Sequence, residues 1–170
     1  MKVLGVSGTP RPGGNTTILV EEALKAIAGR VETELVALAD YGPPGQRRAG
    51  ALEDVVARIR ACDGLILATP SHFGMPGARL KAVLDATWED AKRGAHEGKP
   101  GACMAVESEW GGELACATLA HFFAAHRMPY LGSVVGRGTK EREILHDMKA
   151  IREAKALANR VADAVLARRG

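Results

Sequence analysis

The chain has 170 residues, of which 46% are hydrophobic and 25% are charged, an ordinary balance for a globular protein. Its 23 basic and 20 acidic residues give a net charge of +3 and are scattered along the chain, so nothing points to nucleic acid as a partner. We expect one domain spanning residues 1–170 and no contact with a membrane, because no apolar run reaches the roughly 18 residues of a bilayer span.

The three cysteines, Cys62, Cys103 and Cys116, are far apart and lie in apolar stretches. Because no C-x-x-C pair is present, we expect neither a zinc site nor an iron–sulfur cluster, and no other metal. An odd number of cysteines, together with a chain that starts on a strand instead of a leader-like segment, predicts a cytoplasmic protein.

Strands and helices are expected to alternate along the whole chain. Residues 2–7 predict a buried strand, and a helix from about 16 to 29 follows because its apolar residues recur at i, i+3, i+4 and i+7. A half-exposed strand is expected at 31–38 and a Gly/Pro-rich loop at 41–50. The remaining expected strands are 64–68, 102–106 and 129–136, and the remaining expected helices are about 52–59, 76–93, 112–126 and 141–169.

Five strands alternating with five helices predict a parallel sheet covered by helices on both faces. The simplest arrangement is a flavodoxin-like three-layer α/β sandwich, with a five-stranded parallel sheet in the order 2-1-3-4-5. In such sheets ligands bind beyond the carboxyl ends of the strands, where the strand order reverses. The loops after strands one, three and four are therefore expected to form the binding site.

The loop after the first strand reads SGTPRPGGNTT and leads directly into a helix. Its backbone N–H groups and the positive end of the helix suit a phosphate. Gly14 stands where a nucleotide-hydrolysing P-loop needs lysine, and the dinucleotide pattern G-x-G-x-x-G is absent, so a terminal phosphomonoester such as that of FMN is favoured. The side-chain donors are Ser7, Thr9, Arg11, Asn15 and Thr16. An alternative is an ordinary turn in which Asn15 or Thr16 caps the helix.

Two further loops carry candidate contacts to a flat ring. The loop after the third strand is stiffened by proline and offers Thr69, Pro70, Ser71, His72, Phe73 and Gly74. The loop after the fourth strand offers Ser108, Trp110, Gly111 and Gly112. Trp110 is expected to stack on or cover a flavin or nicotinamide ring, and the glycines let backbone approach it. His72 and Trp110 are the two candidates for a catalytic contribution. The alternative for the first of these loops is a plain strand-to-helix connection with a solvated His72.

These three loops carry a family resemblance that covers most of residues 3–136. The run GVSGTPRPGGNTTIL resembles the phosphate loop of the NADPH-dependent FMN reductase superfamily, and ATPSHFGMPGARLKAVLDAT resembles its second signature. The runs GKPGA, WGGE and HFFAAHRMPYLGSVVG resemble WrbA-type quinone reductases and related multimeric flavodoxins. The departures are Thr9 in place of serine, His72 in place of tyrosine, and GPPGQRR where iron–sulfur relatives carry cysteines.

The resemblance implies FMN as cofactor and NAD(P)H as co-substrate, with a hydride passed to the flavin and electrons passed on to a quinone or similar small acceptor. It assigns Ser7, Thr9, Arg11, Asn15 and Thr16 to the phosphate, and the residues of the other two loops to the ring and ribityl chain. Gly14 of the first loop is also expected to contact the cofactor. It also implies a homodimer or homotetramer. Two alternatives remain open: a flavodoxin-type electron carrier without its own NAD(P)H turnover, and a flavin-free regulatory module on the same fold. Such carriers tend to be acidic, whereas this chain is slightly basic.

Overall fold

The computed structural model describes residues 1–43, 45 and 49–168. Within these residues, five parallel strands form a sheet in the order β2-β1-β3-β5-β6, which is the predicted order 2-1-3-4-5 when the five main strands alone are numbered. The flavodoxin-like prediction is thereby confirmed. The strands are β1 (Lys2–Ser7), β2 (Glu32–Ala37), β3 (Gly64–His72), β5 (Gly101–Glu107) and β6 (Tyr130–Arg137).

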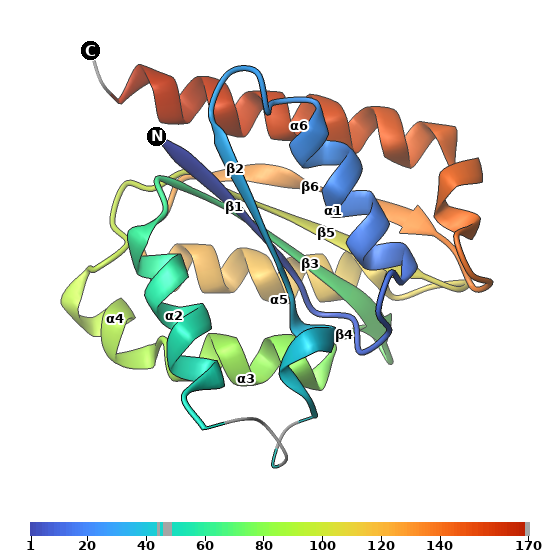
Figure 1. Ribbon diagram of the computed structural model, residues 1–170, viewed down its shortest axis with the longest axis horizontal. Coiled ribbons are helices and arrows are strands. Elements are labelled where there is room, and N and C mark those ends of the chain that lie inside the picture. Colours follow the sequence, from blue (N-terminus) through green and yellow to red (C-terminus); the bar gives the residue numbers. More distant parts are fainter. Residues whose placement is uncertain (44, 46–48, 169–170) are drawn as a thin grey trace.

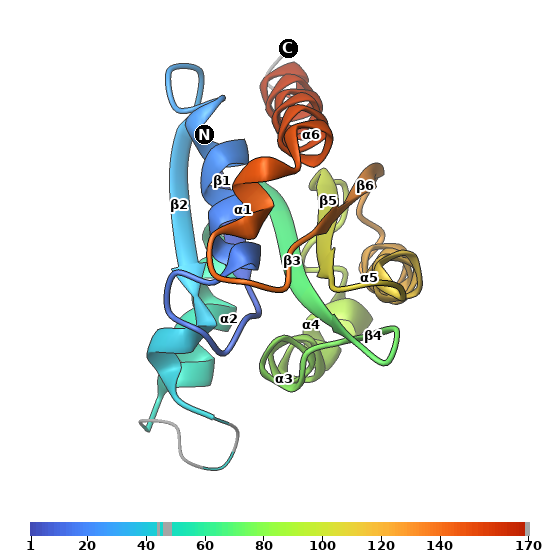
Figure 2. The ribbon, with the colours of Figure 1, turned by 90° about the vertical axis from the view of Figure 1, so that its right-hand side faces the viewer.

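Helices cover both faces of this sheet (Figures 1 and 2). One face carries α1 (Asn15–Lys25) and α6 (Met148–Ala167). The other carries α2 (Ala51–Ala61), α3 (Ala78–Ala86) and α5 (Gly112–Ala125), with the short α4 (Trp88–Arg93) following α3. Two 3-10 turns are η1 (Leu38–Tyr41) and η2 (Glu143–His146). No helix in the described part of the chain has the length and apolar character needed to span a bilayer.

The core consists of two apolar layers, one on each face of the sheet. In β3, Ile66 and Ala68 pack with α1 and α6, whereas Leu65 and Leu67 pack with the helices of the opposite face. All four side chains are fully buried. A continuous apolar run in the sequence therefore becomes a strand buried on both sides, as is typical of parallel sheets.

The third strand is longer than the sequence predicts. It continues from Ala68 to His72 and turns back as the two-residue strand β4 (Met75–Pro76), which pairs with it antiparallel at Ser71–Pro76 and His72–Met75. Part of the expected loop after this strand is thus a small hairpin, because residues 71–72 pair with residues 75–76. Of the loop expected at 41–50, residues 44 and 46–48 lie outside the described residues.

Three helix boundaries also differ from the prediction. The helix expected at 76–93 is interrupted at Thr87, whose hydroxyl donates to the Leu84 carbonyl at 2.7 Å and lies 3.1 Å from Nε2 of His126. The first helix ends at Lys25 because residues 26–30 form turns. The last helix starts at Met148, where the carboxylate of Asp147 accepts a hydrogen bond from the Ala150 N–H. Residue 169, its expected end, lies outside the described residues.

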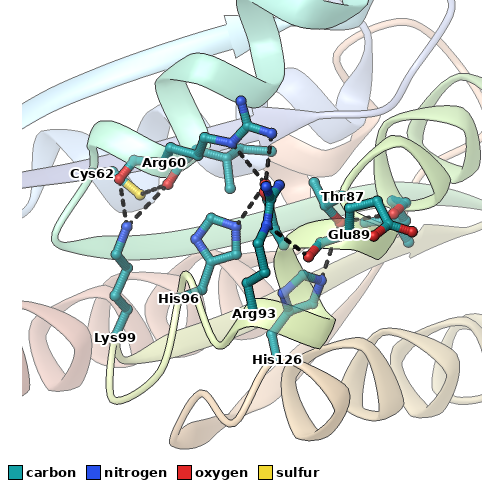
Figure 3. A network of polar contacts seen from close by, with 11 residues as sticks. Arg60, Cys62, Thr87, Glu89, Arg93, His96, Lys99 and His126 are labelled. Carbon is teal, nitrogen blue, oxygen red and sulfur yellow. Dashed lines mark hydrogen bonds and ion pairs between the residues drawn. The ribbon is translucent and has the colours of Figure 1, made fainter.

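A buried polar network joins α2, α4 and the segment before β5 (Figure 3). The buried carboxylate of Asp90 accepts hydrogen bonds from Arg60 at 2.8 and 3.0 Å and from Arg93 at 3.2 Å. Nε2 of the buried His96 lies 3.4 Å from Asp90, and the ring of His126 lies 5.0 Å from that of His96. Burial is the main reason why the pKa of His96 falls to about 4. This network lies at the amino-terminal edge of the sheet, opposite the expected site.

Candidate functional site

A cavity of about 730 Å³ opens at the carboxyl-terminal edge of the sheet, near the point where the strand order reverses between β1 and β3. Its volume falls within the range typical of small-molecule sites. Residues 9–16 line it from the loop after β1, and Pro70, Ser71 and His72 line it from the end of β3. Val106 and Glu107 line it from β5, Ser108 from the loop after β5, and residues 138–141 from the loop after β6.

The loop after β1 presents the start of α1 to this cavity. Gly14 precedes the helix, and no side chain caps the first turn. Because the first N–H groups of a helix have no partner within the helix, they and the positive end of the dipole are available to an anion. Thr9 and Thr16 are buried and line the cavity, and the exposed Arg11 lies beside them. The loop therefore combines one guanidinium with the donors of a helix start.

Two predicted phosphate ligands have partners inside the protein. Oγ of the fully buried Ser7 lies 2.8 Å from Oγ1 of Thr17, which fastens the end of β1 to α1. The side chain of Asn15 donates to the Lys140 carbonyl at 2.8 Å and accepts from the Ile144 N–H at 3.4 Å. The structure thus engages both side chains in holding the loop, and Asn15 also lines the cavity.

The end of β3 places an unpaired polar atom at the cavity. Oγ of Ser71 is buried and has no hydrogen-bond partner among the described residues. Buried hydroxyls are normally paired, so this atom is suited to a ligand. Thr69 is engaged, because its Oγ1 accepts from the Gly77 N–H at 2.8 Å and donates to the Pro70 carbonyl at 2.9 Å. Phe73 lies at the hairpin tip, 92% exposed, and neither it nor Gly74 lines the cavity.

The loop after β5 touches the hairpin of β3 and β4. Gly111 has φ +92°, and a Cβ there would lie 2.9 Å from Oγ of Ser71 and 3.0 Å from the backbone nitrogen of Gly74. Only glycine fits this conformation and this close approach. Gly112 starts α5, and its N–H donates to the Glu107 carboxylate at 2.8 Å. Of the predicted residues of this loop, Ser108 lines the cavity directly.

Trp110 lies beside this cavity and not within it. Its side chain is 64% exposed and lines a neighbouring cavity of about 570 Å³ together with Gly111, Leu114 and Val135. Glu107 lines both cavities. Trp110 therefore lines a second hollow that adjoins the first, and its stacking on a ring stays a prediction.

The sequence analysis missed the loop after β6 and the buried Glu107. Residues 138–141 bring a second cation, Lys140, and an acid, Glu141, to the cavity. The carboxylate of Glu107 is held by the Gly112 N–H and by Nε of Arg137 at 3.2 Å. One signal was available: all five parallel strands end at the same edge, and the run GTKE (138–141) directly follows the last of them.

These features fit a molecule with a phosphate at one end and polar atoms further along. A free helix start with Arg11 suits the phosphate, and the unpaired hydroxyl of Ser71 suits a ring or ribityl atom. The fold and the cavity define a flavodoxin-like nucleotide-binding protein. Residues 1–141 match the family described as NADPH-dependent FMN reductase, and the chain belongs to this family. Its cofactor is FMN, and NAD(P)H is the co-substrate.

Individual relatives agree with this assignment. The chain is 31% identical to an iron–sulfur flavoprotein of Methanocaldococcus jannaschii over 188 residues, which cover 97% of each chain. It is 33% identical to an NADPH azoreductase of a Bacillus species over 91 residues, about half of each chain. The solved structure of the Trp repressor binding protein from Bacillus subtilis superposes with a TM-score of 0.76 at 25% identity, covering 91% of this chain and 99% of that one. The three cysteines of the present chain are all buried. None lies in residues 41–50, which contain the run GPPGQRR that departs from the iron–sulfur relatives.

Proposed function

We propose that residues 1–170 form one FMN-binding domain of an NAD(P)H-dependent oxidoreductase that delivers electrons to a quinone or a similar small acceptor. The observation that carries this proposal is the cavity of about 730 Å³ in which the uncapped start of α1 and Arg11 face Ser71 and His72. Membership of the FMN reductase family supports the oxidoreductase class. The azoreductase among the relatives acts with NADPH, in keeping with a nicotinamide as the electron source.

Each lining group then has a binding role. The N–H groups at the start of α1, with Arg11 and Thr9, hold the phosphate. The hydroxyl of Ser71 orients a polar atom of the bound cofactor, and the exposed His72 lines the same cavity beside it. When bound, FMN supplies the redox chemistry, while the chain supplies binding and orientation.

The neighbouring cavity of about 570 Å³ is the proposed binding place of a planar acceptor. The indole of Trp110 and the side chains of Leu114 and Val135 give it one apolar wall, while most of the remaining lining is charged, and it adjoins the cofactor cavity at Glu107. Aromatic rings stack well on tryptophan, so this hollow is the proposed place for a quinone.

A homodimer or homotetramer is part of the proposal. Phe73, Met75, Trp110 and Leu114 are exposed, and Gly74 at the hairpin tip packs against Leu114. This apolar surface beside the cavity suits contact with a second copy. Light scattering should give a mass of twice or four times 17.9 kDa. A mass of one chain at all concentrations would contradict this part of the proposal.

The test of the redox function is an absorbance experiment. The purified protein is mixed with FMN, freed of excess, and treated without oxygen with NADH and NADPH in separate samples, followed by a quinone. We expect a yellow complex that is bleached by at least one nicotinamide and regains its colour with the quinone. Bleaching only by a protein partner would indicate an electron carrier, and a protein that ignores FMN would indicate a flavin-free module. Either result would contradict the proposal.

A further inference from the structure

The segment after β6 is a fourth wall of the cofactor cavity. Residues 138–141 line the cavity together with Arg11 and Gly14 of the loop after β1. Figure 2 shows this segment running past the start of α1, far from it in sequence but beside it in space. The segment therefore faces the end of the cavity that holds the free helix start.

Hydrogen bonds fix the backbone of this segment. The Gly138 N–H donates to the Glu107 carbonyl at 3.0 Å, and the Glu143 carboxylate accepts from the N–H groups of Lys140 at 2.8 Å and Thr139 at 2.7 Å. Those two backbone donors lower the pKa of the Glu143 carboxyl. Because these N–H groups already have partners, the side chain of Lys140 is the positively charged group that the segment offers to an anion.

Asn15 sets the distance between this segment and the start of α1. Its side chain bridges from the first residue of the helix to the Lys140 carbonyl at 2.8 Å and to the Ile144 N–H at 3.4 Å. A Cβ at position 138 would lie 2.7 Å from Nδ2 of Asn15, so the glycine at 138 permits this close packing. The bridge holds the backbone of Lys140 beside the start of α1, and both Lys140 and Arg11 line the cavity.

The charges of the cavity favour a second cation for the phosphate. A phosphomonoester carries close to two negative charges at neutral pH, whereas Arg11 supplies one positive charge. Of the two acids that line the cavity, Glu107 is already held by Arg137 and by the Gly112 N–H. Lys140 is the second cation in the lining, and Glu141 follows it on the same segment.

We propose that Lys140 is a second cationic ligand of the FMN phosphate and that Asn15 is the residue that positions it. The inference rests on the proposed binding of FMN in this cavity. It assigns to Asn15 an indirect part in phosphate recognition, since its side chain acts through the segment after β6.

Riboflavin, which lacks the phosphate, provides the test of Lys140. Dissociation constants for FMN and riboflavin are measured with flavin-free protein by quenching of tryptophan fluorescence. We expect Lys140→Ala to weaken FMN binding about tenfold and to leave riboflavin binding unchanged. Lys92→Ala removes the same charge from α4 at the opposite edge of the sheet and should change neither constant. Glu141→Gln alters the same segment without removing a cation and should not weaken FMN binding.

A double-mutant cycle tests the positioning role of Asn15. Asn15→Ala should weaken FMN binding but not riboflavin binding, and the double variant with Lys140→Ala should bind FMN about as weakly as Lys140→Ala alone. Strictly additive losses, or an equal loss for both flavins, would overturn the role of Asn15. Unchanged FMN binding in Lys140→Ala, or an equal loss in Glu141→Gln, would overturn the role of Lys140. Failure of the unaltered protein to bind FMN would instead overturn the proposed function.

Discussion

Acidification should destabilise this protein through His96. The imidazole is fully buried beside Asp90 and His126, in the network that joins α2 to α4 (Figure 3). Burial is the largest cause that lowers its pKa, followed by the charges of Lys99 and His126, while Asp90 acts to raise it. The result is a pKa of about 4, against 6.5 for an unperturbed histidine. The folded protein therefore resists protonation at a site where the unfolded chain accepts a proton readily.

The sign and the size of the effect follow from these two values. Between pH 6.5 and about pH 4 the unfolded chain binds a proton that the folded protein does not, so the free energy of unfolding falls as the pH is lowered. The full interval corresponds to a loss of about 3 kcal/mol, with most of it complete near the lower value. Burial also lowers the pKa of His126, which adds in the same direction. Burial acts to raise the pKa of Asp90, but the ion pair with Arg60 holds this pKa below its usual value. Protonation of Asp90, which would weaken that ion pair, therefore takes place at lower pH than the effect of His96.

Urea unfolding at a series of pH values measures this loss. Free energies of unfolding are compared from about pH 7.5 to about pH 4.5 for the unaltered protein and for His96→Phe, which keeps an aromatic ring without a titrating group. The unaltered protein should lose about 2–3 kcal/mol more unfolding free energy over this range than His96→Phe. His121→Gln removes an exposed histidine and should keep the slope of the unaltered protein. If His96→Phe loses stability on acidification as steeply as the unaltered protein, His96 does not control the effect.

Three further changes test the site and the core. Arg11→Ala should weaken FMN binding roughly tenfold to a hundredfold in a fluorescence titration, because one charge-assisted contact to the phosphate is lost; equal affinity would count against the phosphate assignment. His72→Ala should alter the FMN affinity or the rate of NAD(P)H oxidation, and a protein unchanged in both would remove His72 from the site. Gly101→Ala places a Cβ 2.2 Å from Cε1 of Phe123 inside the sheet–α5 layer, so urea unfolding should show a loss of about 1–3 kcal/mol. An unchanged midpoint would mean that the Phe123 ring moves aside freely.

The fold was predictable because its signals are local and repeated. The periodicity of apolar residues located the five main strands and most of the helices, and the right-handed crossover rule then left few sheet orders. The break at Thr87 was not predictable in this way. The Thr87 hydroxyl at this break contacts His126, which is 39 residues away in sequence and meets it only after folding.

The candidate site was predictable as a set of loops but not as a set of side-chain contacts. Three loops followed from the strand order, and the phosphate loop from its glycines, hydroxyl groups and arginine. The partners of Ser7 and Asn15, and the place of Trp110 in the adjoining cavity, required the packed structure. Lys140 was missed because it lies 129 residues beyond Arg11, on a loop that no short motif marks.

The amino-acid pattern by itself determined a flavodoxin-like sheet and the family, since both depend on short-range periodicity and on motifs read within single loops. Only the tertiary structure decided which polar groups line the cavity and which form hydrogen bonds that join the loops around it. The physical reason is that a hydrogen bond such as that from Asn15 to the Lys140 carbonyl joins segments more than a hundred residues apart. Its geometry exists only once both ends of the chain are packed against the same sheet.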